Sequence, residues 1–426
     1  MGHYPGRHAM RRLSAAIMAS ILLLVAGCLQ QRQTAPTLQP APNQAVRITV
    51  AAAGDLLMHN TVVNSAYDSA TRHYDFSPEF AAIAPYLSSP DYTIANLETR
   101  LAGPSFGYAG YPRFNSPAEL AQAVREAGVD LLSTANNHSL DMGWPGIVNT
   151  LNNLDAAGMA HIGTYRTPAE KASPLIVDVR GIKLAWLNYT ATTNGLSLPP
   201  GKGFALNLLS PEAVAAEARE ARRGGADLVL AMIHFGNEYQ RYPDANQRQI
   251  ASQLAASGVD VIINSHPHVV QPIEVLSVQR DDGRTHNCIV AYSLGNLIAD
   301  QRWRYSDSGI ILYLDIVKDQ AGTRVQGASY LPVYVQKSTT AGRLRFRVLP
   351  VSPAIPVAAD NSLTAADKTR MAQVWAELTA HLNDPGHGIS PYQAQPAANS
   401  VSLLLRPAQQ FPAGPPGKIH EHLHLG

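Results

Sequence analysis

Apolar residues recur in short runs along the middle of the chain, separated by segments with helical spacing. Seven strand-like runs lie at residues 47–55, 92–98, 129–138, 183–190, 226–236, 259–268 and 288–296. Runs that are apolar at nearly every position suit strands buried on both faces, as in a parallel sheet. Segments 116–128, 210–225 and 245–258 each end in glycine and predict helices. The pattern therefore predicts an α/β fold with central, mostly parallel β-sheets flanked by helices.

Two of these predicted helices begin with the dipeptide Ser-Pro, at Ser116 and Ser210. Serine is a favoured N-cap, and proline is tolerated at the first helical position because its missing N–H would lack a partner there anyway. We therefore expect both serines to cap the helices that follow them.

The two ends of the chain differ from this middle part. Residues 1–27 combine early arginines with an apolar run at 13–25, which predicts a signal peptide. Ala26 and Gly27 before Cys28 resemble a bacterial lipobox, which implies cleavage before Cys28 and its lipidation. An uncleaved anchor with an incidental cysteine is the alternative, although the run is short for a membrane-spanning helix.

Four parts follow from these boundaries. Residues 28–45, rich in Gln and Pro, read as a flexible tether, and residues 46–345 as the folded domain. Residues 346–426 form an extension with one amphipathic helix at 362–384 and a Pro- and Gln-containing tail. His420, His422 and His424 in that tail are either incidental histidines of a solvated segment or metal ligands.

Composition narrows the function. Thirty-three basic and 32 acidic residues give a net charge of +1 without a basic stripe, so we expect no nucleic-acid partner. The chain has two cysteines, and if Cys28 carries lipid then Cys288 has no partner for a disulfide. Cys288 lies in an apolar run and is expected to be a small buried residue. Residues 195–203, GLSLPPGKG, have the wrong spacing for a phosphate loop, so no nucleotide site is predicted.

Ligand-type side chains stand where the predicted strands end. They are Asp55, Asn96, Glu98, Asn136, Asn137, His138, His234, Glu238, His266 and His268. Parallel strands bring their carboxyl ends to one edge of a sheet, where ligands bind. Imidazole and carboxylate together suit Mn, Fe or Zn. Each residue alone reads equally as a turn or a cap, but five such strand ends favour a metal site.

His266 and His268 flank a single proline after an apolar run. In an extended segment residues i and i+2 point the same way, so we expect both imidazoles to face one cavity. The proline reduces the freedom of the backbone between them.

Eight motifs occur in the order of a known family. They are GDLLMH (54–59), YDFSPEF (74–80), ANLET (95–99), YPRFNSP (111–117), STANNHSLDMGWPG (133–146), IHFGNEY (233–239), SGVDVIINSHPHVVQPIE (257–274) and YSLGNLI (292–298). With them, residues 48 to 300 resemble the CapA family, named for a poly-γ-glutamate capsule biosynthesis protein. The fold of that family is similar to that of calcineurin-like metallophosphoesterases.

The resemblance implies a role for each matching residue. Asp55 and His268 would bind a first metal, and Asn137, His234 and His266 a second, with Glu98 bridging the two. His138 would be the catalytic imidazole that protonates a leaving group, oriented by Asp141. Further candidates near the site are His59, Asn96, Asn136, Glu238 and Asn296.

Three positions depart from the phosphoesterase pattern. Leu57 stands where a histidine is usual, Glu98 replaces an aspartate, and Ser265 replaces a glycine. The first site thereby loses one expected ligand. The sequence is therefore compatible with either one or two bound divalent transition-metal ions, which would be Mn, Fe or Zn.

The sequence thus predicts an exported envelope protein, lipid-anchored through Cys28, and in the outer membrane if the cell has two membranes. We expect a metal-dependent hydrolase of a phosphoester or an anionic polymer such as poly-γ-glutamate, connected with capsule or exopolymer biosynthesis. The alternative is a non-catalytic accessory subunit of a capsule or exopolymer assembly or export machine, and a capsule-synthesis complex is an expected partner in either case.

Overall fold

The computed structural model describes residues 1, 45–280, 282–355, 362–382, 386 and 388–393. The predicted signal peptide, Cys28, nearly all of the tether and the histidine-containing tail lie outside these residues. Among the described residues, no helix has both the length and the apolar character that crossing a membrane requires.

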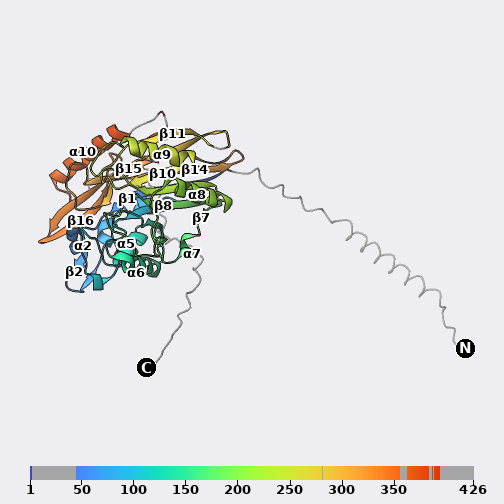
Figure 1. Ribbon diagram of the computed structural model, residues 1–426. Coiled ribbons are helices and arrows are strands. Elements are labelled where there is room, and N and C mark those ends of the chain that lie inside the picture. Colours follow the sequence, from blue (N-terminus) through green and yellow to red (C-terminus); the bar gives the residue numbers. More distant parts are fainter. Residues whose placement is uncertain (2–44, 281, 356–361, 383–385, 387, 394–426) are drawn as a thin grey trace, which may run out of the picture.

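The larger of two main sheets has a parallel half and an antiparallel half (Figure 1). In spatial order it contains β16 (Arg343–Pro350), β15 (Gly322–Thr340), β14 (Ser308–Asp319), β1 (Val46–Leu56), β4 (Tyr92–Leu97), β5 (Leu131–Ser133) and β6 (Ala160–Ile162). Strands β1, β4, β5 and β6 are parallel, and β14 to β16 form an antiparallel meander beside β1. Two short strands join it, β13 (Asn296–Ile298) on β1 and β17 (Ile389–Pro391) on β15.

The second sheet is parallel at its centre and antiparallel at its edges. Its order is β11 (Ile273–Gln279), β12 (Thr285–Ala291), β10 (Val261–Ser265), β9 (Leu228–His234), β8 (Ile182–Thr190) and β7 (Leu175–Val179). Its central strands β12, β10, β9 and β8 run parallel. A separate hairpin pairs β2 (Tyr67–Asp68) with β3 (His73–Tyr74). The predicted α/β class with parallel sheets is confirmed.

Helices pack around both sheets (Figure 1). They are α2 (Asn60–Ala66), α3 (Ser77–Phe80), α4 (Ala84–Ser88), η1 (Pro104–Phe106), α5 (Glu119–Glu126), α6 (Gly143–Ala156), α7 (Pro168–Lys171), α8 (Pro211–Arg223), α9 (Ala245–Ala256) and α10 (Ala365–Leu382). Helices α5 and α6 pack on the large sheet, and α8 and α9 pack on the second.

Strand alternation sorts most buried apolar side chains of the described residues into three large cores. In β1, Ala51 and Ala53 face the helices, whereas Val50 and Ala52 face the second sheet. The same period of two in β8 sends Leu187 toward α8 and α9 and Trp186 between the sheets. Both sheets are therefore buried on two faces, as the near-continuous apolar runs predicted.

The two Ser-Pro helix starts behave differently. Ser210 caps α8, with its side chain accepting a hydrogen bond from the backbone N–H of Ala213. The prediction for Ser116 is wrong, because α5 begins at Glu119 and its N-cap is Ala118. Ser116 is instead buried, with its hydroxyl 2.8 Å from that of Thr99, so a local tertiary contact replaces the cap.

Glycine is required where β1 meets the segment before β13. A Cβ on Gly54 would lie 1.9 Å from the carbonyl oxygen of Gly295, and Gly295 itself has a φ of +68°. This approach lets the Asp55 N–H donate to the Gly295 carbonyl at 3.0 Å. It fixes Asp55 at the sheet edge, where the candidate site lies.

The C-terminal third adds structure that the apolar runs did not predict. The long strands β14, β15 and β16 extend the large sheet, and β16 continues it across residue 345. Helix α10 packs on this extension, with Val374 and Leu378 in the core between the sheets. Cys288 in β12 is free and buried, as expected, and burial raises the pKa of its thiol.

Candidate metal centre

The carboxyl ends of five parallel strands meet at one edge. Strands β1, β4 and β5 of the large sheet end near β9 and β10 of the second, and ligand-type side chains lie at these ends or in the loops that follow them. Fully buried acids and imidazoles are rare unless they are paired or bind metal, so this edge calls for an explanation.

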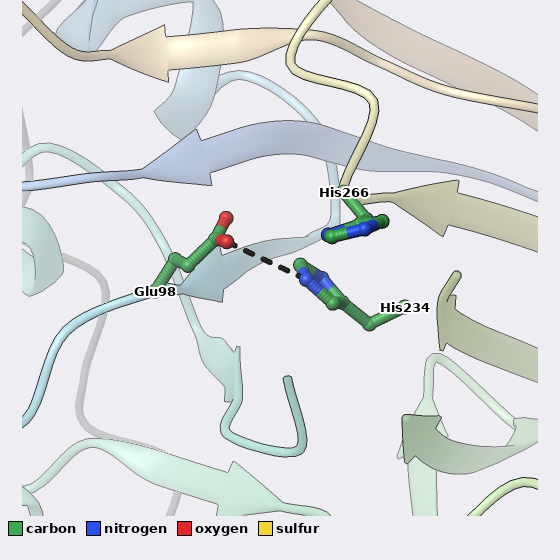
Figure 2. Close-up of side chains that lie close together, drawn as sticks. All are labelled: Glu98, His234 and His266. Atoms are coloured by element: carbon green, nitrogen blue, oxygen red, sulfur yellow. Dashed lines mark ion pairs between the residues drawn. The ribbon is translucent and has the colours of Figure 1, made fainter. Parts of the chain in front are cut away.

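Two groups of three side chains can each hold a metal ion. One comprises Glu98, His234 and His266, and the other Asp55, Glu98 and His268. Within each group one ligand atom per residue lies within 4.8 Å of the others, and all are buried. Figure 2 shows the first group, with the Glu98 carboxylate and the two imidazoles converging from different strand ends. Because Glu98 belongs to both groups, it lies where a carboxylate can bridge two ions.

The prediction that an extended segment carries His266 and His268 is wrong, although both imidazoles do reach groups that share Glu98. Strand β10 ends at Ser265, and His266 and His268 have φ values of +103° and +56°. Such backbone is unusual for residues other than glycine and concentrates at functional sites. The turn separates the ring centroids by 6.2 Å, so His266 joins His234 while His268 joins Asp55.

Neighbouring polar groups orient each imidazole. Nδ1 of His234 lies 2.8 Å from Ser265 Oγ, which leaves its Nε2 near Asn137 Oδ1 and Glu98 Oε1, at 2.9 and 3.4 Å. Fixing one ring nitrogen in this way sets which nitrogen can meet a metal.

The second group is oriented in the same manner. Nδ1 of His268 lies 3.1 Å from Asp55 Oδ2 and 3.2 Å from Asn296 Oδ1. Asn96 donates to Asp55 at 2.8 Å and to Glu98 at 3.4 Å. Asn96 and Asn296 therefore lie behind the ligands and support them.

The two acids respond differently to burial. Burial raises the pKa of Glu98 to about 8, and the nearby charge of Asp55 adds to this. Burial also opposes ionisation of Asp55, but the hydrogen bond and charge of His268 outweigh it and lower the Asp55 pKa. Two carboxylates so close together repel each other, which a divalent cation between them would relieve.

The three imidazoles also differ in the direction of their pKa shifts. Burial lowers the pKa values of His234 and His266 to about 3, so both are neutral with a lone pair to offer. For His268 burial acts in the same direction, but the charges of Glu98 and Asp55 prevail and raise its pKa to about 9.

These residues fit a transition-metal ion. Glu98 Oε1 and His266 Nδ1 are buried without a hydrogen-bond partner, although such atoms are costly to leave unpaired. Mixed imidazole and carboxylate donors are those that Mn, Fe and Zn accept. The donor set and its unpaired atoms thus support metal binding without selecting the metal.

His138 and Asp141 form a pair beside this cluster. His138 Nδ1 lies 2.8 Å from Asp141 Oδ2, and that oxygen also accepts the N–H of Phe114 at 2.7 Å. The Phe114 ring contacts His138 in an edge-on arrangement, with centroids 4.6 Å apart. Both members of the pair are buried, and Asp141 fixes the ring through Nδ1.

The other candidates lie around the two groups rather than in them. Asn137 donates to Asn194 at 3.3 Å, which turns its oxygen toward His234. Asn136 is buried behind the site and donates to Asn96, whereas Glu238 is exposed at the rim. His59 Nδ1 accepts the N–H of Asp300. Leu57 is buried against Phe114 and Ala299 and offers no ligand.

Two supporting residues escaped the sequence reading. Asn188 in β8 accepts the N–H groups of Thr134 and Ala135 and donates to the carbonyl of Met232, so it clamps the loop that carries Asn137. Arg100 is fully buried and donates to the carbonyl of Leu97. A polar residue inside an apolar strand run was the available signal for Asn188.

Sequence comparison places most of the described domain in one family. Residues 49–301 match the sequence profile of the bacterial capsule synthesis protein PGA_cap. The capsule biosynthesis protein CapA of Bacillus anthracis is 27% identical over 305 residues, covering 70% of each chain. The PGA biosynthesis protein CapA of Bacillus subtilis (strain 168) is 28% identical over 275 residues, covering 61% of this chain and 66% of the relative.

Solved structures give looser likenesses. The NAD nucleotidase NadN of Haemophilus influenzae has a TM-score of 0.45 at 13% identity, covering 80% of this chain and 57% of its own. The calcineurin-like phosphoesterase YfkN of Bacillus subtilis has a TM-score of 0.39 at 13% identity, covering 78% of this chain and 98% of its own. At these TM-scores we draw nothing from them about chemistry.

Proposed function

The chain belongs to the PGA_cap family of bacterial capsule synthesis proteins, and we propose that it is a metal-dependent hydrolase acting in capsule or exopolymer biosynthesis. Its substrate is a phosphoester or an anionic polymer such as poly-γ-glutamate. The observation that carries the proposal is the position of Glu98, a buried carboxylate common to two groups of metal-ligand side chains.

Each group would hold one ion. Asp55 and His268 would bind on one side of Glu98, and His234, His266 and the Asn137 oxygen on the other. Metal ions held in this way activate water and stabilise negative charge on oxygen. Asn96, Asn296 and Ser265 keep the ligand atoms turned inward through the hydrogen bonds described above.

His138 is suited to move the proton in this reaction. With Nδ1 held by Asp141, Nε2 is the ring atom left to give a proton to a leaving oxygen. Asp141 is in turn fixed by the Phe114 N–H, so the imidazole cannot rotate freely. Asp141 acts through His138, as a positioning residue.

We further propose that lipidated Cys28 holds the domain at the cell envelope, where a capsule-synthesis complex would be its neighbour. The apolar run at 13–25 and the Ala26-Gly27-Cys28 sequence support this. Replacing Cys28 with serine should release the protein from the membrane fraction, as cell fractionation would show.

The test of the metal centre is elemental analysis of the full chain, with His420, His422 and His424 replaced by alanine in every sample. Near-stoichiometric Mn, Fe or Zn is expected in this parent and should be lost in His266→Ala/His268→Ala. The matched control is His161→Ala/His286→Ala, which removes two histidines that pair with Asp155 and Asp282 elsewhere.

Turnover of phosphoesters and of poly-γ-glutamate would then be measured on the metal-loaded parent. If the folded parent takes up no metal after reconstitution, the proposal of a metal-dependent hydrolase is wrong. The chain would then be the non-catalytic accessory subunit of an assembly or export machine.

A further inference from the structure

Two exposed aromatic rings lie beside the candidate centre. Tyr239 and Trp303 are 39% and 67% exposed, and their ring centroids are 6.3 Å apart. The Tyr239 ring lies 6.2 Å from that of His268. We call Tyr239 and Trp303 the aromatic rim. Adjoining exposed aromatic rings at the mouth of a site are a common mark of ligand binding.

The rim is built onto the metal ligands rather than placed beside them by chance. Tyr239 has a φ of +65°, and its N–H donates to the carbonyl of Pro267 at 2.8 Å. Its hydroxyl accepts from Gln301 at 3.0 Å, and Gln301 accepts from Asn296 at 3.0 Å. Asn296 also contacts His268, so one hydrogen-bonded chain fixes the ring relative to the ligand.

Polar groups border the rings on the side of the site. Glu238 directly precedes Tyr239 in the chain, and Gln301 donates to the Tyr239 hydroxyl. Glu238 is exposed and offers acceptor oxygens at the rim. A carboxylate there disfavours an anionic chain but accepts hydrogen bonds from hydroxyl groups.

We propose that Tyr239 and Trp303 form a subsite for a sugar ring, so that the substrate is a phosphoester of a sugar or glycan. A sugar ring has one apolar face for an aromatic plane and a rim of hydroxyls for Glu238. The two rings meet at 61°, so they do not form a parallel slot that would hold a flat base on both faces. This subsite rests on the proposed function, because it names the substrate of the same centre.

Equilibrium binding tests the subsite. The full chain with its three tail histidines replaced would be titrated with glucose 1-phosphate, glycerol 3-phosphate and adenosine monophosphate by calorimetry. We expect glucose 1-phosphate to bind about tenfold more tightly than glycerol 3-phosphate, the effect of one aromatic stacking contact. Trp303→Ala should bring the two affinities together, and Trp303→Phe should keep part of the preference.

Tyr242→Ala is the matched control, because Tyr242 is an exposed ring that contacts His381 instead of the rim. Equal affinities in the parent, a preference that Trp303→Ala leaves intact, or tighter binding of adenosine monophosphate would each overturn the sugar subsite. Metal content of the same samples separates the two proposals. A preference for glucose 1-phosphate in a protein that binds no metal would support the sugar subsite and contradict the metal-dependent hydrolase. Bound metal without that preference would support the metal centre and contradict the sugar subsite.

Discussion

Strand β10 has a charged cluster at each end, and the two clusters are built on opposite principles. Before the strand, Asp260 pairs with Arg222 and Arg280. After it, His266 and His268 join Asp55, Glu98 and His234. The Asp260 carboxylate has a hydrogen-bond donor for each of its oxygens, whereas the cluster after the strand contains two facing carboxylates and buried atoms without a hydrogen-bond partner.

The Asp260 cluster is complete in its hydrogen bonds. Asp260 accepts from Arg280 at 2.9 Å, from Arg222 and from the backbone N–H of Val229 at 2.8 Å. Arg280 also donates to the carbonyls of Ala255 and Val259. Such a network ties the amino end of β10 to the helix–strand connections around it, and has no need of a ligand.

The comparison shows that burial of charge alone does not mark a binding site. The distinguishing features at the other end are two facing buried carboxylates, positive φ at two histidines, and the lack of a hydrogen-bond partner for Glu98 Oε1 and His266 Nδ1. Buried groups whose mutual arrangement is unfavourable without a ligand indicate one.

The largest effect is expected for Asp260→Asn. Removing the carboxylate of this partly buried network leaves two guanidinium groups without their charged partner and should lower the free energy of unfolding by about 3 kcal/mol. Metal content should not change. Urea unfolding with elemental analysis checks both, and Asp282→Asn, at an exposed carboxylate, is the control. Loss of metal in Asp260→Asn would show that the Asp260 cluster also supports the metal centre, and would contradict the purely structural role given to it.

Glu98→Gln should weaken metal binding and raise the stability of the metal-free protein, which is the opposite of what we expect for Asp260→Asn. We expect metal affinity to fall by about 100-fold or more, because the carboxylate common to both groups is gone. The metal-free protein should become more stable, since a neutral amide replaces a buried acid that faces Asp55. Calorimetry with Mn or Zn, and melting in chelator, measure the two effects. A variant that keeps its metal would show that Glu98 is structural.

Glu79 is a third buried acid, and its hydrogen bonding is intermediate between that of Asp260 and that of Glu98. It lies in α3 and accepts from Ser65 at 2.8 Å, but its second oxygen is unpaired. Burial raises its pKa well above 4.5. The folded state therefore holds the proton more tightly, so its contribution to stability is complete below pH 4.5 and is lost as pH rises toward the folded pKa.

Across that window the free energy of unfolding should fall by about 1.4 kcal/mol for each pH unit relative to Glu79→Gln, which has no proton to lose. Urea unfolding of both proteins between pH 5 and 8 gives the difference. Parallel pH profiles would mean that Glu79 is ionised in the fold.

The smallest effect concerns a supporting residue. Asn296→Ala removes the amide behind His268, and we expect metal affinity to fall by about tenfold, as for other groups that orient a ligand. The same change breaks the chain to Gln301 and should weaken the sugar preference. Chelator competition measures the first effect. An unchanged metal affinity would show that Asp55 alone holds the ring.

The sequence was informative where one residue type has one physical meaning. Apolar runs predicted the parallel strands, and polar residues after them predicted which side chains would meet at the edge. Asp55, Glu98 and His234 could be placed because a parallel sheet leaves little choice about where its strands end.

It was less informative where long-range contacts decide. The turn that separates His266 from His268, and the burial of Ser116 against Thr99, depend on neighbours far along the chain. The first six residues of β15 alternate between exposed and partly buried positions, so the sequence there lacks the apolar run that marked the other strands. Asn188 reads as a polar interruption of β8 until its partners in the β5 loop are known.

The division of the ligands between two sheets has a consequence for how the molecule assembles. Asp55 and Glu98 come from the large sheet, His234 and His266 from the second, and more than 200 residues of chain separate the first from the last. A fragment that contains only one sheet lacks part of the ligand set, so an ion can bind only after the two sheets have packed together. Bound metal should therefore slow unfolding and leave the folding rate nearly unchanged, because it stabilises contacts that form after the folding transition state.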